Sequence, residues 1–172
     1  IDIRKFVNTT EPIWMYNTTD TLGFKCIVDV NYLTKDNFTL FYRYAGSGSM
    51  SNWKQFLMGT FGYSKKRRKG PYDEIQVQFE NGPPWREEII NYQSNDNKCA
   101  VFTVNDKIVG GRVDVAIQLR LKASALKSGP GRACASAYKT TTRKAKMTPT
   151  PAYSPHCDIL LKGSGLWFMR PL

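Results

Sequence analysis

The sequence predicts an all-β protein in which eight antiparallel strands run up and down and close into a barrel. The clearest evidence is the strict alternation from residue 111 to residue 122, because a period of two is what a strand with one dry and one wet face requires. Other segments repeat this alternation, and short loops rich in Gly, Asn and Asp separate them, as an antiparallel meander requires. On the dry side of the first segment lie Val113, Val115, Ile117, Leu119 and Leu121; on the wet side lie Asp114, Gln118, Arg120 and Lys122.

The expected elements follow in chain order. A short helix capped by Asp2 and ending near Asn8 comes first, and it is too short to be stable without packing against apolar groups. Eight strands closing a barrel leave room for side chains or for one small ligand. The expected strands are Ile13 to Thr18, Phe24 to Leu33, Asn37 to Ala45, Trp53 to Tyr63, Asp73 to Glu80, Trp85 to Gln93, Lys98 to Val104 and Val113 to Lys122.

The pattern changes after the last expected strand. Arg132 to Lys146 is rich in Ala, Thr and basic residues and predicts a weak helix, and Thr148 to Pro151 predicts extended coil. The apolar tail Leu166 to Met169 needs a covering surface. We therefore expect one domain over residues 1–172, with the barrel from about 13 to 122 and a basic helix, coil and tethered tail over 123–172.

Composition and cysteine usage indicate a globular, secreted protein. The chain is 41% hydrophobic and 13% aromatic, and it contains no run of eighteen apolar residues that would span a membrane. Three N-x-[ST] sequons occur, at Asn8, Asn17 and Asn37. With an even cysteine count and no CxxC pair, they favour an oxidising, extracellular location and two disulfides. Spacing alone leaves three pairings open among Cys26, Cys99, Cys134 and Cys157.

Charge is concentrated in two places. The net charge is +11, and residues 107–172 contain twelve Lys and Arg against two acidic residues, a balance of +10. A second basic cluster is the run Lys65, Lys66, Arg67, Arg68 and Lys69. Such a run is either a solvated loop that keeps the protein soluble or a surface for an anionic partner.

The residue inventory argues against catalysis. His156 is the only histidine, and it neighbours a cysteine expected to be in a disulfide. Glu87 and Glu88 are adjacent in a strand and point to opposite faces, so they cannot form a paired-carboxylate site. No Cys/His cluster has metal-ligand spacing and no Gly-rich loop precedes a helix. We expect no enzyme activity, no catalytic residues, no metal and no cofactor.

Five segments are considered together: DIRKFVNTTEPIW at the start, Tyr16-Asn-Thr-Thr, Lys25-Cys26, Lys98-Cys99-Ala-Val-Phe after Asn-Asp-Asn, and Tyr153-Ser-Pro-His-Cys157. As a set they resemble the salivary lipocalins of ticks, within the superfamily of the histamine-binding proteins. The resemblance implies an eight-stranded barrel with a helix packed outside, secretion into the host, and interference with host immune defence by binding. It also implies the pairs Cys99–Cys134 and Cys26–Cys157. The basic Pro/Thr-rich segment and the apolar tail have no counterpart in that pattern.

The principal functional expectation is a small hydrophobic ligand inside the barrel, such as a sterol, fatty acid or eicosanoid. A biogenic amine ranks lower, because the strand patterns place Asp114, Glu74 and Glu80 on the polar face. The alternative is that the apolar residues simply fill the barrel. The expected lining residues are Trp14, Tyr42, Phe61, Phe79, Phe102, Ile117 and Leu119.

The other functional expectation is a protein inhibitor that acts through its outer surface. The basic run at residues 65–69 would meet an acidic surface on a host defence protein such as a complement component, cytokine or receptor, and the charge would speed the encounter. Sulfated glycans would be attracted by the same charge. Nucleic acid is not expected, because the aromatic residues lie on the dry faces and not among the basic residues. We expect a monomer.

Overall fold

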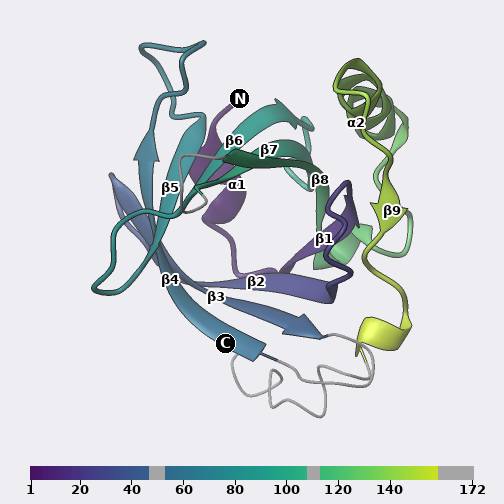
Figure 1. Cartoon of the computed structure of the whole chain (residues 1–172), viewed down its shortest axis with the longest axis horizontal. Helices are drawn as coiled ribbons and strands as arrows, with labels where there is room; N and C mark the ends of the chain where they lie inside the picture. Colours follow the sequence, from purple (N-terminus) through teal and green to yellow (C-terminus); the bar gives the residue numbers. More distant parts are fainter. Residues whose placement is uncertain (47–52, 108–112, 159–172) are drawn as a thin grey trace.

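The computed structural model describes residues 1–46, 53–107 and 113–158 of the chain. It confirms the predicted fold class: an up-and-down antiparallel barrel of eight strands, with a short helix at the N-terminal end and a longer helix outside (Figure 1). The elements are α1 (Ile3–Val7), β1 (Ile13–Thr18), β2 (Lys25–Thr34), β3 (Phe38–Gly46), β4 (Trp53–Gly62), β5 (Glu74–Phe79), β6 (Arg86–Gln93), β7 (Cys99–Lys107), β8 (Val113–Lys122), η1 (Ala123–Ala125), α2 (Arg132–Lys144) and β9 (Thr150–Pro151).

Strand pairing follows the chain order and then closes on itself. Each of β2 to β7 pairs with the next strand, and β1 pairs with both β8 and β2. In the closing pair Ile13 lies opposite Asp29. The two-residue strand β9 pairs with Asn17 and Thr18 at the end of β1. It lies in the segment that the sequence predicts as extended coil. Because β1 joins β2 to β8, the sheet closes into a barrel whose interior is separated from its outer surface.

The helix α1 plugs one end of the barrel (Figure 1). Asp2 caps it by accepting a hydrogen bond from the backbone N–H of Lys5 at 3.2 Å. Ile3 and Phe6 are fully buried and pack inside the barrel, where the Phe6 ring lies 5.8 Å from that of Phe102. Burying these two apolar side chains stabilises a helix that is too short to stand alone.

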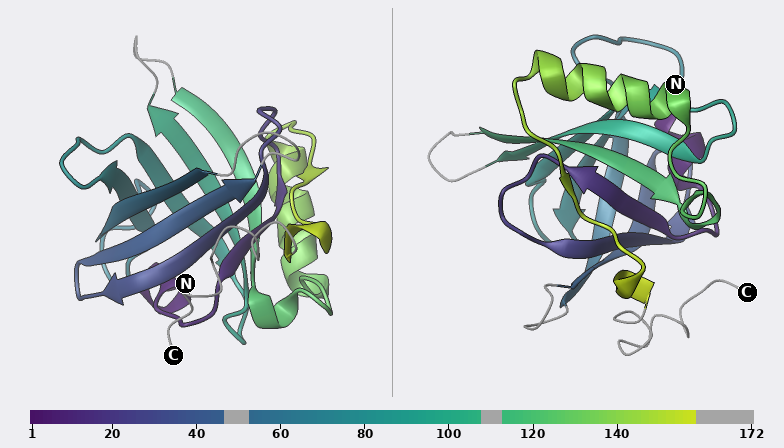
Figure 2. Two further views of the ribbon diagram at one scale, coloured as in Figure 1. Left: turned by 90° about the horizontal axis from the view of Figure 1, so that it is seen from below. Right: turned by 90° about the vertical axis from the view of Figure 1, so that its right-hand side faces the viewer.

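A second apolar core lies outside the barrel, between α2 and strands β7 and β8 (Figure 2). Cys134, Tyr138 and Thr142 form the buried face of α2, and the Tyr138 hydroxyl donates to the carbonyl oxygen of Ile117 at 3.3 Å. Ile117 and Leu119 belong to this outer core. The alternation predicted for β8 is therefore present, but its apolar face is the outer one and its polar face lines the interior.

A third apolar core forms where the C-terminal segment crosses β1, β2 and β3. Trp14, Val28 and Tyr44 are buried there beside Cys157, and the Trp14 ring meets the Tyr153 ring edge-on at 5.0 Å. The segment therefore covers the outer faces of these strands in the same way that α2 covers β8.

Two disulfides hold the outer elements to the barrel. Cys26 pairs with Cys157 and Cys99 pairs with Cys134, which confirms the pairing implied by the resemblance. The first fixes the C-terminal segment to the start of β2, and the second fixes α2 to the start of β7. Among the described residues, no helix has the length and apolar character that crossing a membrane requires.

Candidate functional site: a cavity with a charged floor

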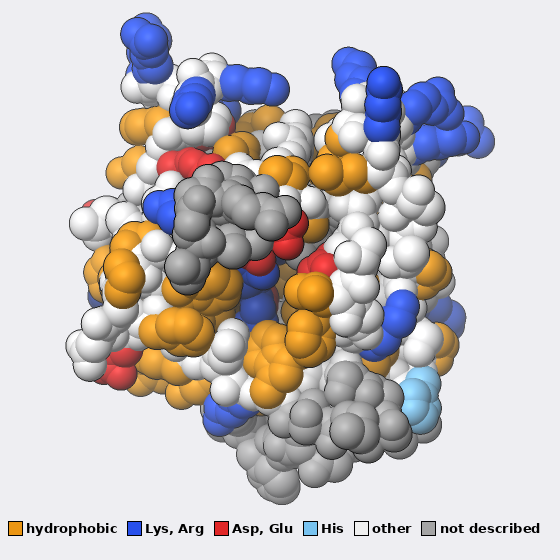
Figure 3. All heavy atoms as spheres, in the orientation of Figure 1, with side chains coloured by type: hydrophobic (Ala, Val, Ile, Leu, Met, Phe, Trp, Pro, Cys, Tyr) orange, Lys and Arg blue, Asp and Glu red, His pale blue; other side chains and the backbone are white. Residues whose placement is uncertain are grey.

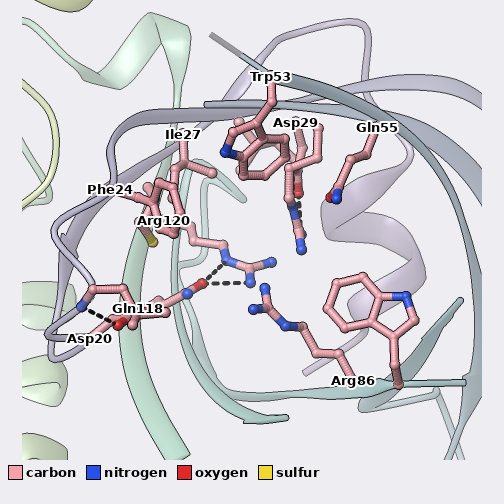
Figure 4. Close-up of a pocket in the computed structure, with 14 residues that line it drawn as sticks. Asp20, Phe24, Ile27, Asp29, Trp53, Gln55, Arg86, Gln118 and Arg120 are labelled. Carbon is pink, nitrogen blue, oxygen red and sulfur yellow. Dashed lines mark hydrogen bonds and ion pairs between the residues drawn. The ribbon is translucent and has the colours of Figure 1, made fainter. Parts of the chain in front are cut away.

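The barrel contains a cavity of about 330 Å³ at the end opposite α1. Its walls are mainly apolar and aromatic, and its floor is charged (Figure 4). Figure 3 shows Lys or Arg side chains at the bottom of a hollow surrounded by hydrophobic ones. The wall residues are Ile13, Met15, Leu22, Phe24, Ile27, Trp53 and Trp85, and the polar lining residues are Asp20, Asp29, Arg43, Gln55, Arg86, Gln118 and Arg120.

The floor is a network of ion pairs around Glu88. Arg43 donates from Nη1 to Glu88 Oε2 at 2.9 Å and from Nε to Asp29 Oδ1 at 2.7 Å. Arg120 donates from Nη1 to Glu88 Oε1 at 2.8 Å. Glu88 is 1% exposed, Arg43 4% and Arg120 6%. The network divides the interior into an apolar plug below, built on α1, and the open cavity above.

Mutual attraction keeps these groups charged. Burial raises the pKa of Glu88, but the neighbouring Arg120, Arg43 and Arg86 outweigh it and hold this pKa well below its usual value. Burial lowers the pKa of Arg43, and Asp29 and Glu88 together bring it well above its usual value. Arg120 also lies over the Phe102 ring, 4.1 Å from its centroid. The charges therefore persist at neutral pH at the boundary between plug and cavity.

Arg86 is the least satisfied cation of the floor. Within the described part of the chain it donates hydrogen bonds to Asp106 only, including one from Nη2 at 3.0 Å. Its Nη1 atom lies 3.8 Å from Glu88 Oε2, beyond hydrogen-bonding distance. Arg86 and Arg120 thus approach the same carboxylate, and both line the cavity. An anionic group above them would satisfy their remaining N–H donors.

None of the seven side chains expected to line a ligand site lines this cavity. Phe61 and Phe102 lie inside the barrel but belong to the lower plug. Phe79 is 45% exposed and stacks on the Trp85 ring at 5.3 Å. The other four lie outside the barrel wall: Ile117 and Leu119 under α2, Trp14 under the C-terminal segment, and Tyr42 against Phe56 and Lys54 on the outer face of β3 and β4.

The interior of the barrel contains carboxylates as well as apolar side chains. Asp29 and Glu88 both point inward, and so does Arg43, in the same strand as Tyr42. The interior face of β3 carries Phe41 and Arg43, and Tyr42 lies on its outer face. Because Asp29 and Glu88 are both bonded to Arg43, neither is free to hold an amine cation.

The other predicted surface residues lie apart from the cavity. Residues 65–69 form the loop between β4 and β5, where Lys65, Lys66, Arg68 and Lys69 are exposed. Of the sequon residues, Asn8 and Asn37 are exposed and Asn17 is half-buried in β1. Over the described ranges, no group of His, Cys, Asp and Glu is arranged to hold a metal ion. The apolar tail 166–169 lies outside the described residues.

A carboxyl pair on the outer wall introduces a pH dependence. Glu74 on β5 is 6% exposed, and it shares a hydrogen bond with Glu87 on β6. Burial and the neighbouring Glu87 and Asp73 raise the pKa of Glu74 from 4.5 to about 7. The folded protein therefore binds an extra proton between these two values. The contribution of protonated Glu74 to the stability of the fold is complete below the unfolded-state pKa, and it is lost as the pH rises through about 7.

We expect Glu74→Gln to remove this loss, because the amide can donate to Glu87 at every pH. At pH 8 the variant should be more stable than the parent by on the order of 2 kcal/mol, with little difference at pH 5. Thermal unfolding across this range measures the effect. Glu80→Gln, at an exposed position after β5, serves as the control. A constant difference between Glu74→Gln and parent at all pH values would contradict the assignment.

Comparisons with known proteins bear on the fold. No family model matches the sequence, and no curated protein matches it. Among solved structures, the siderocalin Ex-FABP aligns with a TM-score of 0.59 at 9% identity, covering 84% of this chain and 91% of that one. A dog lipocalin allergen aligns with a TM-score of 0.57 at 10% identity, covering 81% of this chain and 90% of that one.

A third solved structure is Japanin from Rhipicephalus appendiculatus, bound to cholesterol. It aligns with a TM-score of 0.52 at 8% identity, covering 86% of this chain and 96% of that one. At such low identities the likeness concerns the fold. The chain therefore has the lipocalin fold, as the resemblance in its sequence implied.

Proposed function

We propose that this protein is a secreted binding protein, not an enzyme, that sequesters a small hydrophobic ligand in the open half of its barrel. The observation that carries the proposal is the cavity of about 330 Å³ with aromatic and aliphatic walls. This volume lies at the lower end of the range typical of ligand pockets, which favours a compact or single-chain ligand. The cholesterol bound by Japanin, which has the same fold, supports a lipid-sized guest.

The ligand's head group is inferred from the charged floor. Arg86 Nη1 has no hydrogen bond among the described residues, and it lies near Glu88, the carboxylate with which Arg120 forms an ion pair. Two guanidinium groups directed at an apolar cavity suit a carboxylate, which accepts charge-assisted hydrogen bonds from both. A fatty acid or eicosanoid therefore fits better than a neutral sterol, with its chain against Trp53, Ile27 and Phe24.

The proposal is tested with two probes that differ only in the head group, decanoic acid and decan-1-ol. Trp53 and Trp85 line the cavity, so their fluorescence reports binding directly. We expect the acid to bind more tightly, and Arg86→Gln to weaken it about tenfold while leaving the alcohol unchanged. Arg4→Gln, which removes an exposed guanidinium on α1, is the matched control.

Two results would count against the proposal in different ways. Equal binding of acid and alcohol, unaffected by Arg86→Gln, would leave a lipid carrier without a carboxylate site. Binding of neither probe, together with no co-purified small molecule in the native mass spectrum, would overturn sequestration itself.

Interference with host defence through a host protein is the second candidate. It is favoured by the exposed basic loop at residues 65–69, whose charged groups form no ion pair among the described residues. Exposed cations that lack internal partners favour approach of an acidic protein surface and give a salt-dependent association rate. The resemblance to tick salivary proteins supports secretion into a host, and the two disulfides suit an extracellular location.

A further inference from the structure

The outward face of α2 carries a row of cations. Arg132, Lys139 and Arg143 are seven and four residues apart, so they lie on one side of the helix, away from the buried Cys134 and Tyr138. At 1.5 Å per residue, the row is about 16 Å long. Lys144, in the last turn, and Lys146, just after the helix, are exposed cations next to this row. Figure 3 shows Lys and Arg side chains gathered at this corner of the molecule, away from the cavity mouth.

Among the described residues, no carboxylate forms an ion pair with this row. The sequence contains no Asp or Glu between Val115 and Cys157. In the described parts of the chain, every ion pair lies elsewhere, within the barrel or at α1. Lys139 and Arg143 also stand one turn apart, an arrangement of like charges that weakens a helix by a few tenths of a kcal/mol. This repulsion offsets part of the favourable interaction that Arg143, in the last turn, makes with the helix dipole.

The barrel holds this row rigidly. The Cys99–Cys134 disulfide joins α2 to β7, and the Tyr138 hydroxyl donates to the Ile117 carbonyl oxygen. Figure 2 shows α2 lying along the outer wall of the barrel. A ligand that binds several of these cations at once does not have to order the helix first, which lowers the entropic cost of binding.

The chemistry of the same face selects the kind of partner. The residues between the cations are small, namely Ala133, Ser136 and Thr140. Protein interfaces depend on buried aromatic and aliphatic anchors, and single-stranded nucleic acid depends on aromatic stacking. This face offers neither, so binding rests on charge alone. The disulfides indicate an extracellular setting, where the abundant linear polyanions are sulfated polysaccharides.

We propose that the outward face of α2 is a binding site for a linear sulfated polysaccharide of the glycosaminoglycan class. The site is separate from the ligand cavity, and its occupancy would hold the protein at cell surfaces and matrix while the cavity takes up its ligand. Lys and Arg clusters are the usual basis of heparin recognition.

The test compares two variants of equal charge. One carries Arg132→Gln, Lys139→Gln and Arg143→Gln; the control carries Lys65→Gln, Lys66→Gln and Arg68→Gln in the loop between β4 and β5. Binding to heparin is measured over a range of salt concentrations around 0.15 M. We expect the α2 variant to bind at least tenfold more weakly than the loop variant, with a slope of log affinity against log salt smaller by about two to three.

Three controls make the outcome decisive. Desulfated heparin should bind weakly to the parent, and decanoic acid titrations should be the same for both variants, which separates this site from the proposed carrier function. Equal losses in the two variants would mean that net charge alone drives retention, and would overturn the proposal. Equally tight, equally α2-dependent binding of duplex DNA would overturn the assignment to sulfated polysaccharide.

Discussion

Replacing Glu88 with Gln is expected to destabilise the fold by about 3–5 kcal/mol, because it leaves buried cations without their shared anion. Glu88 accepts hydrogen bonds from both Arg43 and Arg120, at 2.9 and 2.8 Å. Glu88 is 1% exposed, so water does not reach its carboxylate in the folded protein. Arg43 retains Asp29, whereas Arg120 keeps only its bonds to Gln118 among the described residues.

Urea unfolding measures this effect, and Glu80→Gln at an exposed position provides the control, with an expected change within about 0.5 kcal/mol. A loss below about 1 kcal/mol for Glu88→Gln would show that the interior admits water or that the arginines rearrange freely. Lowering the pH has little effect on this network until strongly acidic conditions. The Glu88 pKa lies well below its usual value, so its contribution is present above the unfolded-state pKa and is lost only as the pH falls through the folded-state value.

Loss of the Cys26–Cys157 disulfide is expected to cost about 5 kcal/mol in the chain-entropy model, since it closes a loop with a sequence separation of 131 residues. The Cys99–Cys134 bridge, with a separation of 35, should contribute about 4 kcal/mol. The first bridge also holds the C-terminal segment over Trp14 and Val28, so its loss exposes an apolar surface.

Unfolding of the two double Cys→Ser variants in denaturant, beside the parent, measures these contributions. We expect both variants to be less stable than the parent. The Cys26→Ser/Cys157→Ser variant should lose more stability than the other variant and should also be secreted in lower yield. Unchanged stability in either variant would contradict the prediction, and a thiol assay on the native parent should find no reactive cysteine.

Much of the strand order could be predicted from the sequence because local chemistry determines it. The alternation in residues 113–122, and loops rich in Gly, Asn and Asp, identify strands and turns without knowledge of their neighbours. The disulfide pairing could not be obtained from spacing; it came from the resemblance.

The residues that line the cavity could not be predicted from the sequence in the same way. Arg43 stands among the aromatic residues of β3, and Arg86 and Glu88 share one face of β6 with the apolar Ile90. These two patterns indicated charge on the inward faces. In isolation, however, an alternating strand shows only that its two faces differ. An arginine on the polar face of β8 is compatible with solvent exposure until its ion-pair partner on another strand is known.

By itself the sequence determined the strand segments, the antiparallel order, the short capped helix at the start and the basic character of the last third, because these depend on residues that are close in the chain. The tertiary structure alone decided which face of each strand is inside. Because α2 and the C-terminal segment cover the outer wall, the apolar faces of β8 and β2 can be buried outside the barrel. The interior was then free to hold Arg43, Glu88 and Arg120, whose charges are stable there because strands distant in sequence bring them together.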